Sequence, residues 1–387
     1  MWRSRDGANG ALTQRILQAN PLLEAFGNAK TVRNENSSRF GKFIQILFAA
    51  DHTICGGRVR HYLLEKARVV SQHEGERNYH VFYHICAGVD GDLKQRLHLR
   101  SPEHFHYLNQ SGVFELLDTD GKPMCDEKLE FSRTQQSMAQ MRIEPAVQDQ
   151  IWEILAAVLH LGNLEFETVA NKTAADGAKL REESEATMRI VADLFKCDYQ
   201  ILDKGLTCSL VKVTGEAQPI EVPQSTESCA HARDALSKVV YEKLFAWLVS
   251  CINECLQHSD ALEGLSEAEK RKIEAHFIGV LDIFGFEVFE NNSFEQLCIN
   301  YANEALQQQF INQMLHAMMA QYEKEGVKVD AIPFEDNAPC LELLESKLGI
   351  FSMLDDECNF PKGSDETFLH KLMDNHKSHS HLKPGGS

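Results

Sequence analysis

The sequence predicts an α/β fold, and three observations lead to that expectation. Two short apolar runs rich in β-branched residues, at 42–49 and 277–283, are typical of strands. Longer segments such as 235–256 carry apolar residues at helical spacing. The 387 residues are 43% hydrophobic and 25% charged, which suits a globular protein with two or three subdomains.

The first hundred residues predict both kinds of element. Residues 1–10 are expected to form a loop or a frayed start, and residues 11–26 a helix interrupted near Asn20-Pro21. The interruption is expected because proline disfavours the helical conformation of the residue before it. The segment 54–64 is strand-like, and the apolar segment 79–87 favours a helix over a strand.

The remaining segments are mostly helical. Apolar spacing predicts a helix over 151–161, and we expect 168–186 to be an exposed loop running into a helix. A charged helical stretch is expected at 267–274, followed by the buried strand at 277–283. Ser293 and Gln296 fit a capping box that starts a helix running to about residue 325. One face of that helix carries Phe294, Leu297, Cys298, Tyr301, Ala305 and Phe310.

Composition excludes several classes of protein. Lys and Arg number 39 and Asp and Glu 57, a net charge of −18, so nucleic acid is not an expected partner. The 11 cysteines are scattered without a Cys-x-x-Cys pair, which indicates reduced thiols in a cytoplasmic protein. We expect no transmembrane segment and no export signal, because no apolar run is long enough and the start lacks an apolar core.

One candidate nucleotide-binding loop follows the second apolar run, in the sequence Asp-Ile-Phe-Gly-Phe-Glu at 282–287. A carboxylate at the end of a strand, here Asp282, can hold the hydration shell of Mg²⁺. Gly285 has no Cβ, so its amide can approach a phosphate oxygen closely, and Glu287 is available for pairing. The D-x-x-G pattern alone is too short to be specific.

A second candidate loop lies far upstream, in the sequence Asn-Glu-Asn-Ser-Ser-Arg-Phe-Gly at 34–41. The hydroxyls of Ser37 and Ser38 can ligate Mg²⁺ and touch a terminal phosphate or an attacking water, and Asn34 adds an amide donor. Arg39 is suited to a bidentate grip on a carboxylate, such as that of Glu287. The alternative is an asparagine-rich turn with a surface arginine, and the downstream D-x-x-G-x-E argues against it.

Taken together, the two loops resemble those of the myosin motor domain, where N-x-x-S-S-R-F-G is switch I and D-I-F-G-F-E is switch II. Kinesins carry a related S-S-R but continue with Ser-His and use D-L-A-G-S-E, so the likeness is to myosins. Five further segments are similar to myosin segments in the same order: GERNYHVFYHICAG (75–88), AAVLHLGNLEFE (156–167), RDALSKVVYEKLFAWLV (233–249), the region 281–310, and LGIFSMLDDECNFPKGSDETFL (348–369).

The resemblance implies a P-loop NTPase-like core whose central twisted sheet is incomplete and carries large helical insertions. It implies five parts, as follows: an N-terminal segment with switch I (1–50), an upper, mostly helical subdomain (51–276), a strand with switch II (277–290), a relay helix (291–325) and the start of a lower actin-binding subdomain (326–387).

The resemblance also implies a role for each candidate residue. Ser38 would ligate Mg²⁺ and Asp282 would order its shell. Ser37 would lie beside the γ-phosphate and the lytic water, while Asn34 and the Gly285 amide would contact phosphate. Arg39 and Glu287 would form the salt bridge that closes the site. The implied cofactors are ATP and Mg²⁺, the implied partner is the actin filament, and the implied location is the cytoskeleton.

One departure from the family pattern limits the expected activity. No G-x-x-x-x-G-K-[ST] phosphate-binding loop occurs in the sequence. We expect the chain to begin after that loop and to end before the converter and the lever arm that binds light chains. No steady-state ATPase is expected from these residues alone, so their status as an enzyme stays open. The leading hypothesis is part of an actin-activated ATPase motor, and the alternative is a non-catalytic, myosin-derived interaction module.

Overall fold

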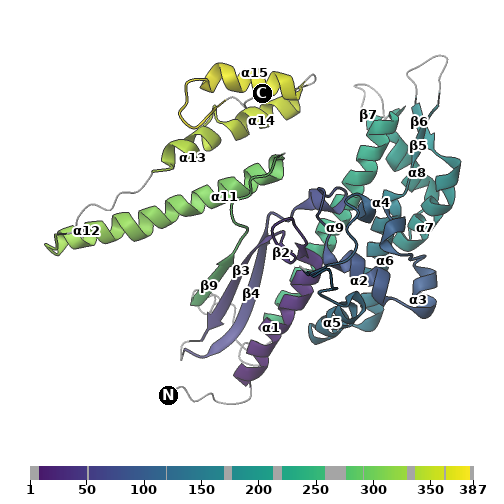
Figure 1. Cartoon of the computed structure of the whole chain (residues 1–387), viewed down its shortest axis with the longest axis horizontal. Coiled ribbons are helices and arrows are strands. Elements are labelled where there is room, and N and C mark those ends of the chain that lie inside the picture. The colour runs from purple at the N-terminus through teal and green to yellow at the C-terminus, as the bar shows by residue number, and fades with distance from the viewer. Residues whose placement is uncertain are drawn as a thin grey trace. The chain divides into compact units, whose positions relative to one another are not determined.

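The computed structural model divides the chain into two compact units, Met1–Ile283 and Phe284–Ser387 (Figure 1). It contains both helices and strands, as the α/β prediction requires. The division into five parts is not tested by this split and stays a prediction. The structure describes residues 8–49, 52–118, 120–169, 177–211, 220–257, 276–290, 292–328, 336–360 and 363–383.

A three-stranded antiparallel sheet lies in the first unit. Its strand order is β4 (Ile54–Tyr62), β3 (Gly41–Phe48) and β9 (Phe277–Asp282). Lys42 of β3 is opposite Asp282 of β9, and Phe43 of β3 is opposite both Leu281 and Arg60. The strands predicted at 42–49 and 54–64 are confirmed, and so is the strand predicted at 277–283.

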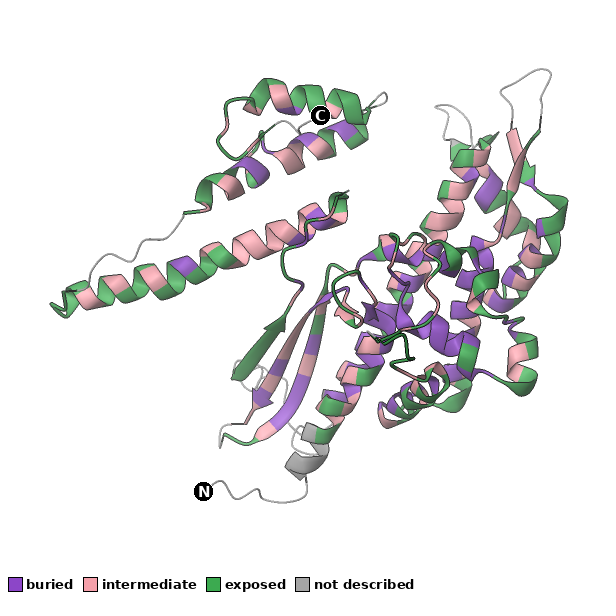
Figure 2. Ribbon diagram, viewed as in Figure 1, coloured by how far each residue is buried: buried purple, intermediate pink, exposed green. Residues whose placement is uncertain are grey.

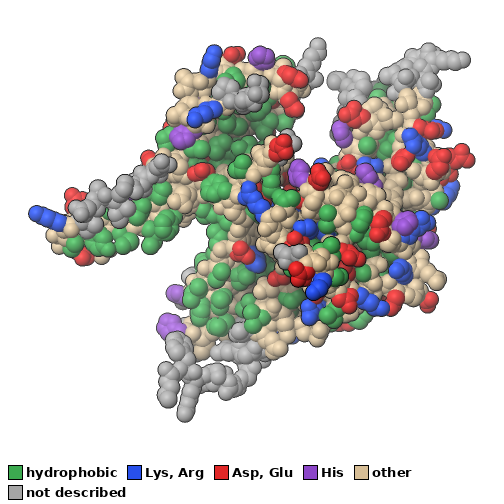
Figure 3. All heavy atoms as spheres, viewed as in Figure 1, with side chains coloured by type: hydrophobic (Ala, Val, Ile, Leu, Met, Phe, Trp, Pro, Cys, Tyr) green, Lys and Arg blue, Asp and Glu red, His purple; other side chains and the backbone are tan. Residues whose placement is uncertain are grey.

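The prediction that this last strand is buried was wrong. All six residues of β9 are exposed, and Figure 2 shows the strand in the colour of exposed residues. Figure 3 shows hydrophobic side chains gathered over this strand, where the exposed residues are Phe277, Ile278, Val280 and Leu281. An apolar, β-branched run predicts strand conformation but not what covers the strand, because backbone conformation and coverage by other elements depend on different interactions.

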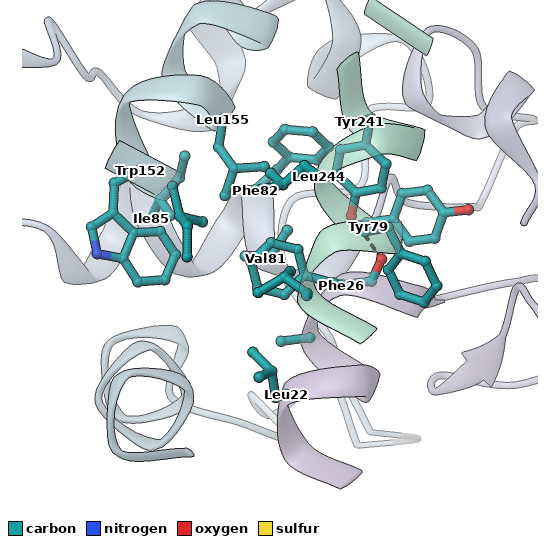
Figure 4. Close-up of a cluster of buried hydrophobic side chains, with 14 of the residues drawn as sticks. Leu22, Phe26, Tyr79, Val81, Phe82, Ile85, Trp152, Leu155, Tyr241 and Leu244 are labelled. Carbon is teal, nitrogen blue, oxygen red and sulfur yellow. Dashed lines mark hydrogen bonds between the residues drawn. The ribbon is translucent and has the colours of Figure 1, made fainter. Parts of the chain in front are cut away.

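Helices α1 (Ala8–Gly27), α2 (His80–Gly88), α6 (Pro145–Gly162) and α9 (Thr226–Gln257) surround the main core of this unit. They confirm the helices predicted at 79–87, 151–161 and 235–256. Tyr79 and Tyr241 stack with ring centroids 4.9 Å apart, and the Tyr241 hydroxyl donates a hydrogen bond of 2.7 Å to the Phe26 carbonyl (Figure 4). These contacts join α1, α2 and α9 at one point.

Helix α1 is continuous, so the predicted interruption at Asn20-Pro21 was wrong. Pro21 lies inside the helix and cannot donate to the carbonyl four residues earlier, that of Leu17. Leu17 is 63% exposed, so solvent can satisfy that carbonyl. Leu22 and Phe26 beyond the proline are buried in the core, and this packing holds the second half of the helix in line.

The segment 168–186 also differs from its prediction. Instead of a loop it contributes to a hairpin of β5 (Phe166–Val169) and β6 (Gly177–Leu180), followed by a short 3-10 turn and α7 (Glu185–Phe195). Glu167 and Lys179 form an ion pair of 2.9 Å across the two strands. Strands of four residues are too short to show alternation in a charged sequence. The helix predicted at 267–274 lies outside the described residues.

The rest of the first unit consists of short elements. The helices are α3 (Gly91–Arg96), α4 (His106–Asn109), α5 (Glu127–Gln140) and α8 (Tyr199–Thr207), with 3-10 turns at Lys66–Val69, Pro102–His104 and Glu182–Ser184. Two-stranded pairs are formed by β1 (Asn28–Ala29) with β2 (Ser37–Ser38) and by β7 (Cys208–Val211) with β8 (Ile220–Pro223). All eleven cysteines lie in the described part and none is in a disulfide, as predicted.

The second unit is helical. Helix α11 (Phe294–Phe310) continues through a π-helical turn, Ile311–His316, into α12 (Ala317–Lys324), which confirms the long helix predicted to about residue 325. The capping box is present, with the Ser293 amide donating to Gln296 Oε1 at 2.9 Å. The other helices are α13 (Ala338–Glu345), α14 (Ile350–Asn359) and α15 (Asp365–His376), and Tyr301 of α11 contacts Phe351 of α14. Among the described helices of the chain, none has the length and apolarity to span a membrane.

Candidate nucleotide-binding loops

The sheet register brings the ends of the two candidate loops together. The first loop ends at Gly41, where β3 begins, and the second begins at Asp282, where β9 ends. Because β3 and β9 are antiparallel, with Lys42 opposite Asp282, both ends lie at the same end of neighbouring strands. A Cβ on Gly41 would lie 3.1 Å from a side-chain carbon of Ile283, so the two segments are in close contact.

Asp282 has a cationic neighbour across the sheet. Lys42 Nζ lies 3.1 Å from Asp282 Oδ2, and the Asp282 side chain is 54% exposed. The carboxylate is therefore held by an ammonium group yet accessible from solvent. No group of three His, Cys, Asp or Glu side chains within the described residues is arranged to hold a metal.

The first loop is held by bonds among its own residues. The Asn36 amide donates to Asn34 Oδ1 at 2.9 Å, and Arg39 Nη1 donates to Ser37 Oγ at 3.3 Å. Ser38 donates its hydroxyl proton to the Phe40 carbonyl at 2.8 Å. Since this bond uses the proton only, the lone pairs of Ser38 Oγ remain able to ligate a cation, and the metal role of Ser38 stays a prediction.

Arg39 is fully buried, which rules out the alternative of a surface arginine. Its Nε donates to Glu65 Oε2 at 2.7 Å, and Arg68 Nε donates to the same oxygen at 2.7 Å. Arg68 is in turn paired with Glu76 at 2.8 Å, and the Tyr79 hydroxyl donates to the Glu65 carbonyl at 2.8 Å. A buried ionic cluster therefore fixes the arginine of the first loop.

Electrostatics keep this cluster charged. Burial acts to raise the pKa of Glu65, but the guanidinium groups of Arg68 and Arg39 hold that pKa below its ordinary value. Glu65, Arg68 and Glu76 were not among the residues predicted from the sequence. The available signal was that these charged residues lie beside the apolar segments around Tyr79, since charged groups need partners when they are buried.

The second loop is held by helix α11 in the second unit. Asn300 Oδ1 accepts from the Glu287 amide at 2.9 Å, and Asn300 Nδ2 donates to the Glu287 carbonyl at 2.8 Å. Asn303 Nδ2 donates to the Phe284 carbonyl at 2.9 Å. The sequence analysis missed both asparagines, although they lie three residues apart on one face of the predicted helix.

Two predicted features of the site stay predictions. A Cβ on Gly285 would meet nothing within 4 Å, so packing within the described structure does not require glycine there. Its predicted role is instead an approach to phosphate. Arg39 and Glu287 belong to different units, and the latch between them remains an expectation.

Two buried histidines lie on α2, and one of them, His80, contacts the first loop. His80 Nε2 lies 3.1 Å from Asn36 Oδ1, and the rings of His80 and His84 stack one helical turn apart on α2. Burial lowers the pKa of His84 to about 3, and burial, with Arg77 nearby, also lowers the pKa of His80 well below 6.5. Both imidazoles are therefore neutral in the folded protein at neutral pH.

These shifts make stability depend on pH in a defined direction. Below pH 6.5 these histidines take up protons in the unfolded chain but stay neutral in the folded chain. The free energy of unfolding is therefore highest above pH 6.5 and falls as the pH decreases. We expect a loss of about 1.4 kcal/mol for each of His80 and His84 between pH 7.5 and 5.5. Urea unfolding at the two pH values measures it.

A variant identifies the residue responsible. His84→Gln should remove one histidine's share of this pH dependence, whereas His231→Gln, at an exposed position of α9, should leave it unchanged. Equal pH dependence in the wild type and in His84→Gln would contradict the assignment. The chosen pH interval lies above the range in which most carboxylates titrate.

Comparison with known protein families gives a match over almost the whole sequence. Residues 3–385 match the family described as myosin head (motor domain). The match covers nearly the whole chain, and the chain belongs to this family.

Individual relatives come from several myosin classes. The chain is 40% identical to an unconventional myosin-VI of Bos taurus over 97% of its own length and 30% of the relative's. It is 43% identical to a myosin-2B of Naumovozyma castellii over 92% of its length and 24% of the relative's. Against a myosin-I heavy chain of Dictyostelium discoideum it is 40% identical, with 98% and 15% covered. The chain thus spans less than a third of each of these relatives.

Proposed function

We propose that the complete protein is a myosin-type motor that binds and hydrolyses ATP with Mg²⁺ and couples this reaction to movement on actin filaments. The observation that carries the proposal is the β3–β9 register, which sets Gly41 and Ile283 in contact and Lys42 beside Asp282. Two loops with phosphate-sensing chemistry on neighbouring strands suit a site that opens and closes around a terminal phosphate.

In this proposal each residue has one task. Ser38 would hold the cation through the lone pairs of its Oγ, while its hydroxyl proton stays hydrogen-bonded to the Phe40 carbonyl. Asp282 would hold the hydrated cation, and Asn34, Ser37 and the Gly285 amide would contact the phosphate. Bound Mg²⁺ would supply charge neutralisation at the phosphates. Arg39 keeps Glu65 on its Nε edge while Glu287 takes the opposite edge, which closes the site.

The finer architecture belongs to the same proposal. The sheet would be the part of a P-loop NTPase-like core that carries both switches, and α11 with α12 would be the relay helix. Asn300 and Asn303 would then transmit the position of the second loop to that helix through its backbone. Actin contact, light chains on a lever arm and a cytoskeletal location follow as expectations for the complete motor.

Glu287→Ala in the full-length protein is the sharpest test. We expect the steady-state Mg-ATPase rate to fall on the order of 100-fold, because the closed site would lose the carboxylate that grips Arg39. The full-length protein is required, since the 387 residues contain no Walker-type loop. Arg39 is a poor target for this test, because replacing it would also disturb the buried cluster around Glu65.

Glu290→Ala is the matched control. Glu290 is an exposed carboxylate three residues further along, and its removal should change the rate less than twofold. If the Glu287→Ala variant had the same Mg-ATPase rate as the wild type, the proposed pairing of Glu287 with Arg39 would be refuted. A wild-type protein without any Mg-ATPase would refute the motor itself and favour the alternative, a non-catalytic interaction module.

A further inference from the structure

A pocket of about 430 Å³ lies in the first unit, where the end of α3 meets α6 and α7. Its floor includes the buried residues Leu99, Phe105 and His160. The whole lining consists of Lys94, Gln95, His98, Leu99, Arg100, His104, Phe105, His160, Asn163, Thr187 and Ile190. It contains two permanent cations and three histidines but neither Asp nor Glu, in a chain whose net charge is −18.

The two cations are not committed to acidic partners. Across the described ranges, no ion pair joins Lys94 or Arg100 to a carboxylate, whereas Arg96 and Lys196 are both paired with carboxylates. Arg96 lies between them in sequence and behaves differently. It is outside the lining, and its guanidinium contacts Asp149 at 3.1 Å and Glu153 at 3.8 Å.

The backbone at the pocket has an unusual conformation. His98 has φ of 51°, in the left-handed region, at the position after α3 where helices usually have glycine. Neighbouring bonds secure the turn, with the Leu99 amide donating to the Lys94 carbonyl at 3.2 Å. Strained backbone of this kind is found disproportionately where side chains must be presented to a ligand.

The opposite wall is fixed as well. Asn163 Nδ2 donates to the His104 carbonyl at 2.8 Å, and Asn163 Oδ1 accepts from the His106 amide at 2.8 Å. His160 Nε2 donates to the Leu97 carbonyl at 3.0 Å, which joins the floor to the end of α3. The walls that carry Arg100, His98 and His104 are therefore preorganised before anything binds.

We propose that this pocket binds a small phosphorylated anion, held by Lys94 and Arg100 at its mouth. The planar guanidinium of Arg100 can donate hydrogen bonds to two phosphate oxygens at once, and Lys94 adds a second charge. Gln95 and Thr187 supply neutral donors around them. The absence of carboxylates from the lining removes the repulsion that an anion meets over most of this acidic surface.

Burial is the main cause that lowers the pKa of His160 to about 4, and His98 and Arg100 act in the same direction. His160 is thus neutral near pH 7, and its Nε2–H remains on the Leu97 carbonyl. The charge that attracts the anion therefore comes from Lys94 and Arg100.

The test measures pyrophosphate binding by calorimetry in the full-length protein and in two variants. We expect the double variant Lys94→Gln/Arg100→Gln to bind roughly 10-fold or more weakly, since two charge-assisted contacts are lost. The control Arg96→Gln removes a charge from the same helix outside the lining and should change the affinity less than twofold. Both altered side chains lie at the surface, so circular dichroism should show an unchanged fold.

Each outcome is decisive. Equal losses in the double variant and in Arg96→Gln would reveal non-specific attraction and overturn the proposal, as would the absence of binding. Pyrophosphate bound at the candidate nucleotide loops would not respond to Lys94→Gln/Arg100→Gln, so failure here is separable from failure of the motor hypothesis.

A parallel assay uses phosphatidylcholine vesicles with and without a phosphoinositide. Binding to those vesicles that depends on Lys94 and Arg100 would identify a lipid headgroup as the source, and binding of pyrophosphate alone would identify a free ligand.

Discussion

Glu65→Ala should lower the free energy of unfolding of the first unit by about 3–5 kcal/mol, the usual cost of leaving a buried charge without its partner. Glu65 receives hydrogen bonds from Arg39 and Arg68, and both guanidinium groups are buried. Removing the carboxylate leaves two like charges facing each other in a medium of low dielectric. Urea unfolding of the variant and the wild type measures the difference.

The control for this prediction is the next ion pair along the chain. Glu242 pairs with Lys66 at 3.2 Å, and both side chains are well exposed. Glu242→Ala should therefore cost less than about 1 kcal/mol. If the free energy of unfolding of Glu65→Ala lay within about 1 kcal/mol of the wild-type value, the cluster would not be what holds Arg39 in place. The loss of unfolding free energy in the isosteric variant Glu65→Gln should lie between the losses in Glu65→Ala and Glu242→Ala, because glutamine keeps an acceptor oxygen but has no charge.

Trp152→Ala is expected to cost about 3–5 kcal/mol, the second large effect. Trp152 is fully buried on α6, with its ring 5.0 Å from that of Phe131 on α5. Figure 4 shows it beside Ile85 at the edge of the core cluster. Truncation would leave a cavity between helices that are joined by few polar contacts at this point.

Trp152→Phe separates packing from hydrogen bonding at the same position. The indole Nε1 is buried and has no hydrogen-bond partner among the described residues. Phenylalanine removes this unsatisfied donor while filling much of the volume, so its cost should stay below about 1.5 kcal/mol. Thermal or urea unfolding of both variants gives the comparison. Equal costs would mean that the indole nitrogen contributes a contact of its own.

Periodicity predicted the elements best where a long helix packs one face. The spacing in 235–256 was sufficient, because tertiary packing and local pattern agree there. For the helix after Ser293, spacing predicted the conformation but not the buried face, since Phe294 and Phe310 are exposed while Gln296 and Ile299 are buried. Periodicity failed where packing against other elements decides the conformation or the burial of a segment. Pro21 predicts a break that core packing of Leu22 and Phe26 overrides, and the apolar run of β9 gives no sign that its residues are exposed.

The candidate site was predictable in its residue types but not in its supports. Ser37, Ser38, Arg39 and Asp282 follow from hydroxyl, guanidinium and carboxylate chemistry in short motifs. Glu65 is distant in sequence from any motif, and only the folded chain places it against Arg39. A single sequence cannot show which of many glutamates meets a given arginine, because that pairing is set by the packing of α2, β4 and α9.

The pairing of β3 with β9 has a consequence for how the protein is made. Strand β3 is complete on the ribosome after residue 48, whereas its neighbour β9 begins only at residue 277. At translation rates of about 5–20 residues per second, the nascent chain carries one unpaired edge of β3 for on the order of tens of seconds. Substitutions that delay folding of the intervening helices should therefore reduce the yield of protein, even where they leave the finished structure unaltered.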